Sequence, residues 1–61
     1  MKLDNKELKE GDKVIWIEYG ETLEFKETLP PYRGVDLAVF LTKRGYSVFL
    51  PANEVSLIKG Q

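Results

Sequence analysis

The sequence contains no familiar set of catalytic or metal-binding residues. The 61-residue chain has neither His nor Cys, which removes the commonest general base, the commonest zinc ligands and the thiolate nucleophile. Ser47 and Ser56 therefore lack a His that would activate a hydroxyl group. The sequence also has no calcium loop of spaced Asp and Asn residues. It predicts a protein that is not an enzyme and that uses no cofactor and no metal.

Four carboxylates recur at three-residue intervals, at Glu18, Glu21, Glu24 and Glu27. Paired carboxylates can act as general acid and base, but only where burial or a neighbouring charge shifts a pKa. A chain of this length has little interior in which that could occur, although an oligomer could build a site at its shared axis. Two interpretations remain, a solvated acidic segment and an acidic patch for a basic partner.

Basic residues outside the N-terminal segment group only at Arg33, Lys43 and Arg44. They could contact phosphate or an acidic partner, with Tyr32 or Trp16 stacking on a base. The formal net charge is −1, whereas proteins that bind nucleic acid usually carry an excess of cations. Nucleic acid is therefore the less favoured partner, although a local basic patch keeps this alternative open.

The length predicts a single domain, residues 1–61. A domain this small is marginally stable unless a disulfide, a metal or a partner chain supports it, and composition leaves the partner chain open. No apolar run approaches the ~20 residues of a membrane span, and "MKLDNKELKE" is too charged for a signal peptide. We expect a cytoplasmic protein that does not bind membranes.

The elements that would position these residues are short strands. "KVIWIEY", residues 13–19, is rich in β-branched and aromatic residues and predicts a strand. Both of its faces are apolar, so either Trp16 or the pair Ile15 and Ile17 points into the core. "TLEFKE" alternates as a half-buried strand or arm does. "LPPYRG" is expected to interrupt the sheet, because two prolines remove two hydrogen-bond donors.

A hairpin is expected from "VDLAVFLT" and "YSVFL", around residues 43–45. If Arg44 and Gly45 form the centre of the turn, Leu41 lies opposite Val48 and Phe40 lies opposite Phe49. This register places both phenylalanines on one face. The opposite, inner face would then hold Val35, Leu37, Val39, Leu41, Val48 and Leu50.

The ending "VFLPANEVSLI" resembles the end of SH3 domains, with Pro51, Asn53 and Val55 in the characteristic positions. "LKEGDKV" is similar to the Gly-Asp-led strand of many SH3-like small β-barrels, including the KOW-like kind found in bacterial and ribosomal proteins. The resemblance covers about half of the chain. It implies a mostly β protein, a five-stranded SH3-like barrel with a 3-10 turn before the last strand.

The N-terminal segment permits two interpretations. Asp4 could cap a short helical turn, with Glu7 three residues later and Gly11 as its C-cap. Alternatively, the segment is an irregular lead-in, and Leu8 closes the end of the barrel.

The residues that would bind proline-rich peptides in an SH3 domain are not matched. The chain has no second Trp, and Glu54 stands where the helical turn of an SH3 domain carries Tyr. We therefore expect a non-catalytic protein-binding or accessory module with an exposed apolar face. The alternative is a nucleic-acid- or ribosome-associated KOW-like barrel.

Four aromatic residues are candidates for partner contact: Trp16, Tyr32, Phe40 and Phe49. The two phenylalanines and one face of the 13–19 strand need a cover, because aromatic side chains left in water forgo part of their burial energy. Residues 20–34 could supply that cover. An aromatic residue that this segment does not cover would mark an interface with another protein or with a second copy of the chain.

Overall fold

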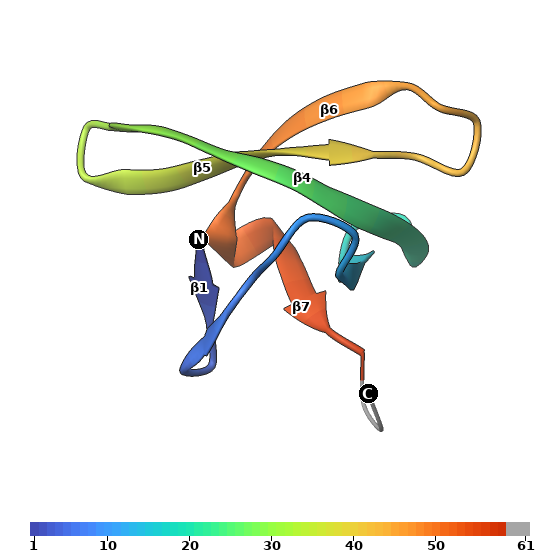
Figure 1. The fold of residues 1–61 in the computed structure, drawn as a ribbon, viewed down its shortest axis with the longest axis horizontal. Helices are drawn as coiled ribbons and strands as arrows, with labels where there is room; N and C mark the ends of the chain where they lie inside the picture. Colours follow the sequence, from blue (N-terminus) through green and yellow to red (C-terminus); the bar gives the residue numbers. More distant parts are fainter. Residues whose placement is uncertain (59–61) are drawn as a thin grey trace.

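The computed structural model describes residues 1–58, which form strands, turns and one 3-10 turn (Figure 1). β1 and β2 form a small hairpin, and the other five strands form one antiparallel sheet in the order β6-β5-β4-β3-β7. The elements are β1 (Lys2–Leu3), β2 (Lys6–Glu7), β3 (Lys13–Trp16), β4 (Glu21–Tyr32), β5 (Val35–Leu41), β6 (Ser47–Pro51), η1 (Ala52–Glu54) and β7 (Val55–Leu57).

The predicted antiparallel β protein, with five main strands and a 3-10 turn before the last of them, is confirmed. Over residues 1–58 the sheet is open, because its outer strands β6 and β7 do not pair with each other. The strand predicted over residues 13–19 ends earlier, at Trp16, whose carbonyl accepts hydrogen bonds from the N–H groups of Tyr19 and Gly20 in a tight turn. No helix in the described part of the chain is long and apolar enough to span a bilayer.

The predicted interruption at "LPPYRG" is wrong, because Pro30 and Pro31 lie inside β4, the longest strand. The pairing of β4 with β5 shifts between Leu29 and Tyr32. A proline is tolerated at such an irregularity, since a residue there need not donate to the ladder. β4 therefore passes through the prolines, and the segment expected to cover the sheet is instead its central strand.

The predicted N-terminal helical turn is also wrong. Asp4 and Asn5 both have positive φ, 47° and 67°, and connect β1 to β2 as a two-residue turn. Short polar side chains tolerate this left-handed conformation, and a turn with two such residues matches the twist of a hairpin. The alternative interpretation of Leu8 agrees better with the structure, because this side chain is 5% exposed and belongs to the core.

The loop between β5 and β6 has three residues rather than the two that we assumed. The N–H of Thr42 donates to the carbonyl of Tyr46 (2.8 Å), and the N–H of Gly45 donates back to the carbonyl of Thr42 (2.9 Å). Gly45 has φ +86°, the left-handed conformation of the last residue in a three-residue hairpin loop with a bulge.

This loop moves the β5–β6 register by one residue from the predicted one. Leu41 lies opposite Ser47 and Phe40 opposite Val48, so neither the Leu41–Val48 pair nor the Phe40–Phe49 pair forms. Because neighbouring residues of a strand point to opposite faces, the shift places Phe40 and Phe49 on opposite sides of the sheet.

The core lies between the inner face of the sheet and the β1–β2 hairpin. Phe40 is fully buried and packs edge-to-face on Phe25 of β4, with ring centroids 5.8 Å apart. Residues 20–34 thus cover Phe40, but as the neighbouring strand. The other buried members of the core are Met1, Leu3, Leu8, Val14, Leu23, Ala38, Leu50 and Val55.

Candidate protein-interaction surface

The register of β4, β5 and β6 creates an apolar face on the side of the sheet away from the core. Ala38 and Phe40 point inward, so the residues that alternate with them on β5 point outward. On β6, Phe49 lies opposite Val39. We call this surface the outer face, and it consists of Leu29, Leu37, Val39, Leu41, Phe49 and Pro51.

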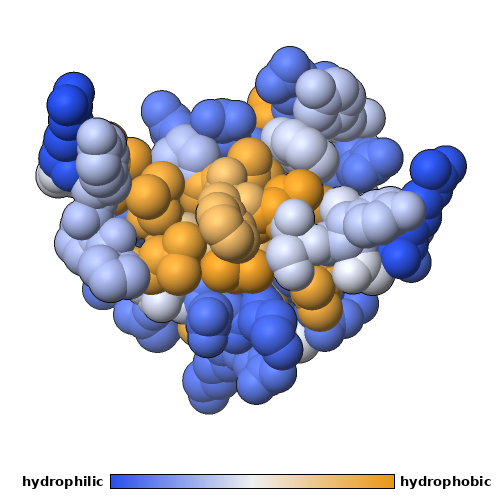
Figure 2. Space-filling model, turned by 90° about the horizontal axis from the view of Figure 1, so that it is seen from above, coloured by the Kyte–Doolittle hydropathy of each residue, from blue (hydrophilic) through white to orange (hydrophobic). Residues whose placement is uncertain are grey.

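Phe49 is the most exposed member of the outer face, with 68% of its surface accessible. Its register neighbour Val39 is buried, although it is not part of the core cluster. Val39 lies between Glu27 of β4 and Phe49 of β6 in the register. Figure 2, which views the molecule from the side of β5 and β6, shows hydrophobic residues gathered in the middle of this surface with hydrophilic residues around them.

The β4 side of the outer face is acidic. Glu27 lies opposite Val39, and Glu24 lies opposite Leu41 in the register. The carboxylate of Glu24 accepts a hydrogen bond from Nζ of Lys13 at 2.9 Å. Glu27 has no ion-pair partner among residues 1–58, so it leaves a negative charge at this rim.

The four predicted aromatic contact residues are not brought together. Phe40 is in the core, whereas Phe49 is exposed on the outer face. Trp16 is half-buried against the core and packs edge-on against Tyr19, at 4.5 Å between ring centroids. Tyr32 is exposed at the β4–β5 turn. Of the four, only Phe49 belongs to the outer face.

The predicted basic grouping is divided between two loops. Arg33 is in the β4–β5 turn, with its guanidinium 5.3 Å from the centre of the Tyr32 ring. Lys43 and Arg44 are in the β5–β6 loop, beyond the other end of β5, and Figure 1 shows the two loops at opposite sides of the molecule. Seven strand residues separate the two loops, roughly 20 Å at the usual rise of a strand.

An open depression lies between the β3–β4 turn and the β5–β6 loop. Its side chains offer one carboxylate, two cations, hydroxyl groups and one phenol, from residues in or beside the two turns: Gly20, Glu21, Thr22, Thr42, Lys43, Arg44 and Tyr46. Within residues 1–58, no three acidic side chains gather as a metal site would require. The depression therefore has polar groups but no buried reactive set.

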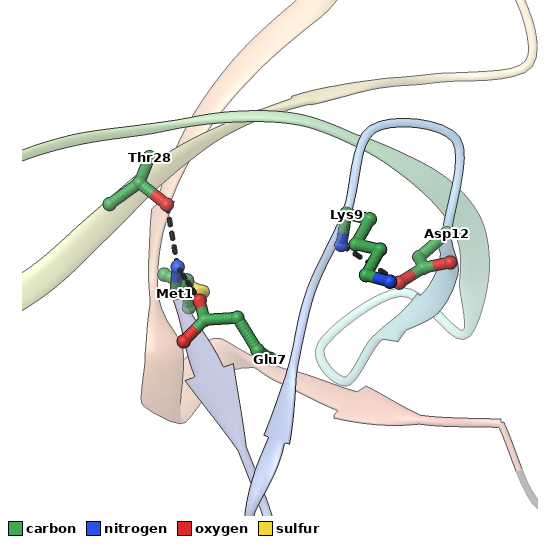
Figure 3. A network of polar contacts seen from close by, with 5 residues as sticks. All are labelled: Met1, Glu7, Lys9, Asp12 and Thr28. Carbon is green, nitrogen blue, oxygen red and sulfur yellow. Dashed lines mark hydrogen bonds and ion pairs between the residues drawn. The ribbon is translucent and has the colours of Figure 1, made fainter.

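A polar network attaches the N-terminal hairpin to the sheet (Figure 3). The ammonium group of Met1 donates to Oε2 of Glu7 at 3.0 Å and to the hydroxyl of Thr28 on β4. Farther along, the N–H of Lys9 donates to Oδ2 of Asp12 at 2.9 Å. The Met1 contacts hold the β1–β2 hairpin over the core, and the Lys9–Asp12 contact closes the turn before β3, so we assign both to the fold.

Sequence reasoning expected Leu29 to help cover the aromatic residues as part of the 20–34 segment, and it assigned Leu37, Val39 and Leu41 to the inner face, whereas all four belong to the outer face. The signal that could have placed them outside was Gly45, because a glycine at the end of a three-residue loop sets a different register from a glycine at the centre of a two-residue turn.

No protein-family model, no curated protein and no solved structure matches this chain. The proposals that follow therefore depend on the geometry of the chain itself.

Proposed function

We propose that this chain is a non-catalytic protein-binding module and that the outer face is its binding surface. The observation that carries the proposal is the 68% exposure of Phe49 beside an apolar row of β5. Aromatic residues, phenylalanine among them, are enriched in protein interfaces, and the residues that contribute most to binding cluster near the centre of the interface. A partner that covered Phe49 would remove a large apolar area from water, which favours association.

We further propose that the architecture is of the SH3-like kind. Two features support this. The 3-10 turn Ala52–Glu54 follows Pro51 directly, and β7 then returns to pair with β3 at the opposite side of the sheet from β6. Because the β4 side of the outer face is acidic, the outer face would favour a partner with an apolar side chain flanked by Lys or Arg.

The test compares Phe49→Ser with Ile17→Ser in binding to a partner isolated with the wild-type protein. Ile17 is a suitable control because it is 56% exposed but lies in the turn after β3, outside the outer face. Calorimetry with the purified partner should show at least a tenfold loss of affinity for Phe49→Ser and less than a twofold change for Ile17→Ser. Equal affinity for both variants would show that the outer face is not the binding surface.

The nucleic-acid alternative has less support, because Arg33 is separated from Lys43 and Arg44 by the length of β5. Phosphate contacts strengthen binding when several cations engage one backbone together. Fluorescence anisotropy with a labelled single-stranded RNA and a labelled duplex, at physiological salt, should show no submicromolar binding. Tight binding that weakens steeply with salt would favour this alternative over the protein-binding proposal.

A further inference from the structure

β6 has a free hydrogen-bonding edge. It pairs with β5 on one side, and among residues 1–58 no strand pairs with its other side. Antiparallel pairs alternate between residues that bond to each other and residues whose backbone groups point away. Thr42 and Tyr46 form a backbone hydrogen-bonded pair. Bonded pairs recur every second residue, so Phe40 and Val48 are also a hydrogen-bonded pair. The N–H and C=O groups of Ser47 and Phe49 therefore point away from β5.

This edge lacks the usual protection against pairing. Natural edge strands are shielded by charges, bulges, prolines or short length. The stretch from Tyr46 to Asn53 has no charged residue, in a chain in which 31% of residues are charged. Pro51, at the end of β6, is the one protective residue in the strand. The opposite edge differs, since β7 has only three residues.

We propose that β6 pairs antiparallel with β6 of a second copy of the chain, about a two-fold axis that places Phe49 opposite its own copy. Phe49 belongs to the outer face as well, but this interface is the edge of β6, so the proposal goes beyond the proposed function and is tested separately from it. In this register Phe49 exchanges two backbone hydrogen bonds with its copy, and each Ser47 N–H donates to the carbonyl of the opposite Pro51. Pro51 has no N–H to donate in return. In this register Pro51 lies at each end of the paired segment, so only the terminal pairs lose a hydrogen bond.

Side-chain matching favours this register. Phe49 meets Phe49 on the outer face, and Val48 meets Leu50 on the inner face, so every facing pair in the middle of the interface is apolar. Moving the axis by one residue, to Val48, would place Phe49 opposite Ser47. With the axis at Phe49, the apolar outer faces of the two copies lie side by side and form one continuous surface across the two-fold axis.

Charge favours edge pairing over stacking of two outer faces. Stacking that brings the two β4 rims together would set Glu27 near Glu27 of the other copy, and like charges that face each other repel, since Glu27 lies on the outer side of β4 and has no ion-pair partner among residues 1–58. Edge pairing brings together two uncharged segments. The total surface of the protein is 4467 Å², and a standard interface of about 800 Å² per partner would require nearly a fifth of it. A five-residue edge buries less, so the dimer is weak and concentration-dependent.

The decisive experiment uses Phe49→Lys and Phe49→Glu, because a residue on a two-fold axis meets itself. Sedimentation velocity is measured from about 1 µM to 1 mM at physiological salt, a range that spans weak association. The wild-type protein and the control Ile17→Lys should dimerise. Each Phe49 variant alone should weaken dimerisation at least about 30-fold, as the loss of an interface hot spot does. An equimolar mixture of the two variants should regain a dimer, because Lys then faces Glu.

A second variant tests the backbone pairing. Ser47→Pro removes an outward N–H at the first residue of the strand, where proline is tolerated, and circular dichroism checks that the variant is folded. It should also weaken the dimer. A dimer that survives Ser47→Pro but not Phe49→Lys would overturn edge pairing in favour of face stacking. A wild-type monomer at every concentration would overturn the second copy as partner. The Phe49→Ser binding experiment would then decide separately whether the outer face binds another protein.

Discussion

Phe40 and Phe49 are two phenylalanines with opposite environments. Phe40 is fully buried and packs on Phe25, whereas most of the Phe49 side chain is in contact with solvent. The difference arises from strand alternation, because Phe40 lies opposite Val48 rather than opposite Phe49. One side chain therefore stabilises the fold, and the other is available to a partner.

Phe40→Ala and Phe49→Ala should consequently differ strongly in stability. Removing a buried phenylalanine costs about 3–5 kcal/mol, which equals the whole stability expected of a domain this small. We expect Phe40→Ala to be unfolded at 25 °C. Phe49→Ala should stay within about 0.5 kcal/mol of the wild type when measured at low micromolar concentration. Circular dichroism at 25 °C shows whether Phe40→Ala is folded, and urea denaturation measures the loss in Phe49→Ala. A folded Phe40→Ala with a loss similar to that of Phe49→Ala would contradict the register.

Arg33 occupies a backbone conformation that its side chain does not favour. It has φ 51° and is followed by Gly34 with φ 78° in the two-residue turn between β4 and β5. This turn type prefers Asn-Gly, since Asn adopts positive φ at lower cost than a residue with a long side chain.

Arg33→Asn relieves backbone strain but removes the exposed contact between Arg33 and the Tyr32 ring. The net effect should be a stabilisation of about 0.5 kcal/mol. Arg33→Val should destabilise it by at least about 1 kcal/mol, because a β-branched residue is more strained at positive φ. The midpoint of thermal unfolding checks both changes, and a lower midpoint for Arg33→Asn would show that the aromatic contact outweighs the backbone strain.

At the scale of the elements, one loop decides which residues of β5 face the solvent. The three-residue loop ends at Gly45, which has φ +86°, and nothing lies within 4 Å of the position that a Cβ would occupy there. Any cost of a side chain at this position therefore comes from backbone strain and not from a clash.

Gly45→Ala should destabilise the protein by about 1 kcal/mol, the cost of a left-handed conformation for alanine. Gly20→Ala is a matched comparison, because Gly20 also has positive φ and open space around it but ends the β3–β4 turn. Chemical denaturation should give similar losses for the two, whereas only Gly45→Ala should alter the amide chemical shifts of β6. Unchanged shifts in β6 would show that the loop glycine does not hold the register.

The sequence contained enough information to predict the β class, the one hairpin around residues 43–45 and the 3-10 turn. The hydrophobic and β-branched runs and the turn residues between them are local signals. The sequence did not predict that β4 continues through Pro30 and Pro31. These prolines are tolerated because the pairing of β4 with β5 is irregular there, and that irregularity cannot be seen in a single strand's sequence. The outer face was missed for a related reason: with a loop one residue longer than assumed, Val48 and Leu50 of β6 still face the core, but they pair with the opposite set of β5 residues, so Leu37, Val39 and Leu41 face outward. Asp4 and Asn5 suit both a helix cap and a tight turn, and packing of Leu8 and Met1 on the core favours the turn.

At the scale of the whole molecule, the β1–β2 hairpin supplies a second layer for a single small sheet. Met1, Leu3 and Leu8 pack on the core cluster, and the Met1 ammonium is bound to Thr28 in the centre of the sheet (Figure 3). A sheet of this size has one face to bury and needs such a layer.

Leu8→Ala should therefore cost about 2–4 kcal/mol, as for other buried leucines. Its neighbour Lys9 is exposed, and Lys9→Ala should change the stability by less than about 0.5 kcal/mol. Both values can be obtained from urea denaturation. A loss below 1 kcal/mol for Leu8→Ala would indicate that the sheet keeps its core without the hairpin.

The pairing of β7 with β3 has a consequence for the order of folding. The hairpins β3–β4, β4–β5 and β5–β6 each join neighbouring segments, but Trp16 pairs with Val55 and Val14 with Leu57, roughly 40 residues apart. Closing so long a loop costs more chain entropy than closing a hairpin, so we expect this contact to form after the local ones have shortened the effective loop. Until then β3 has an unpaired edge and Val14 is incompletely covered. The last pairing to assemble is thus expected to be that of β3 with β7, strands that are far apart along the chain. The transition state for folding is expected to contain the three hairpins of β3, β4, β5 and β6, with β7 still detached.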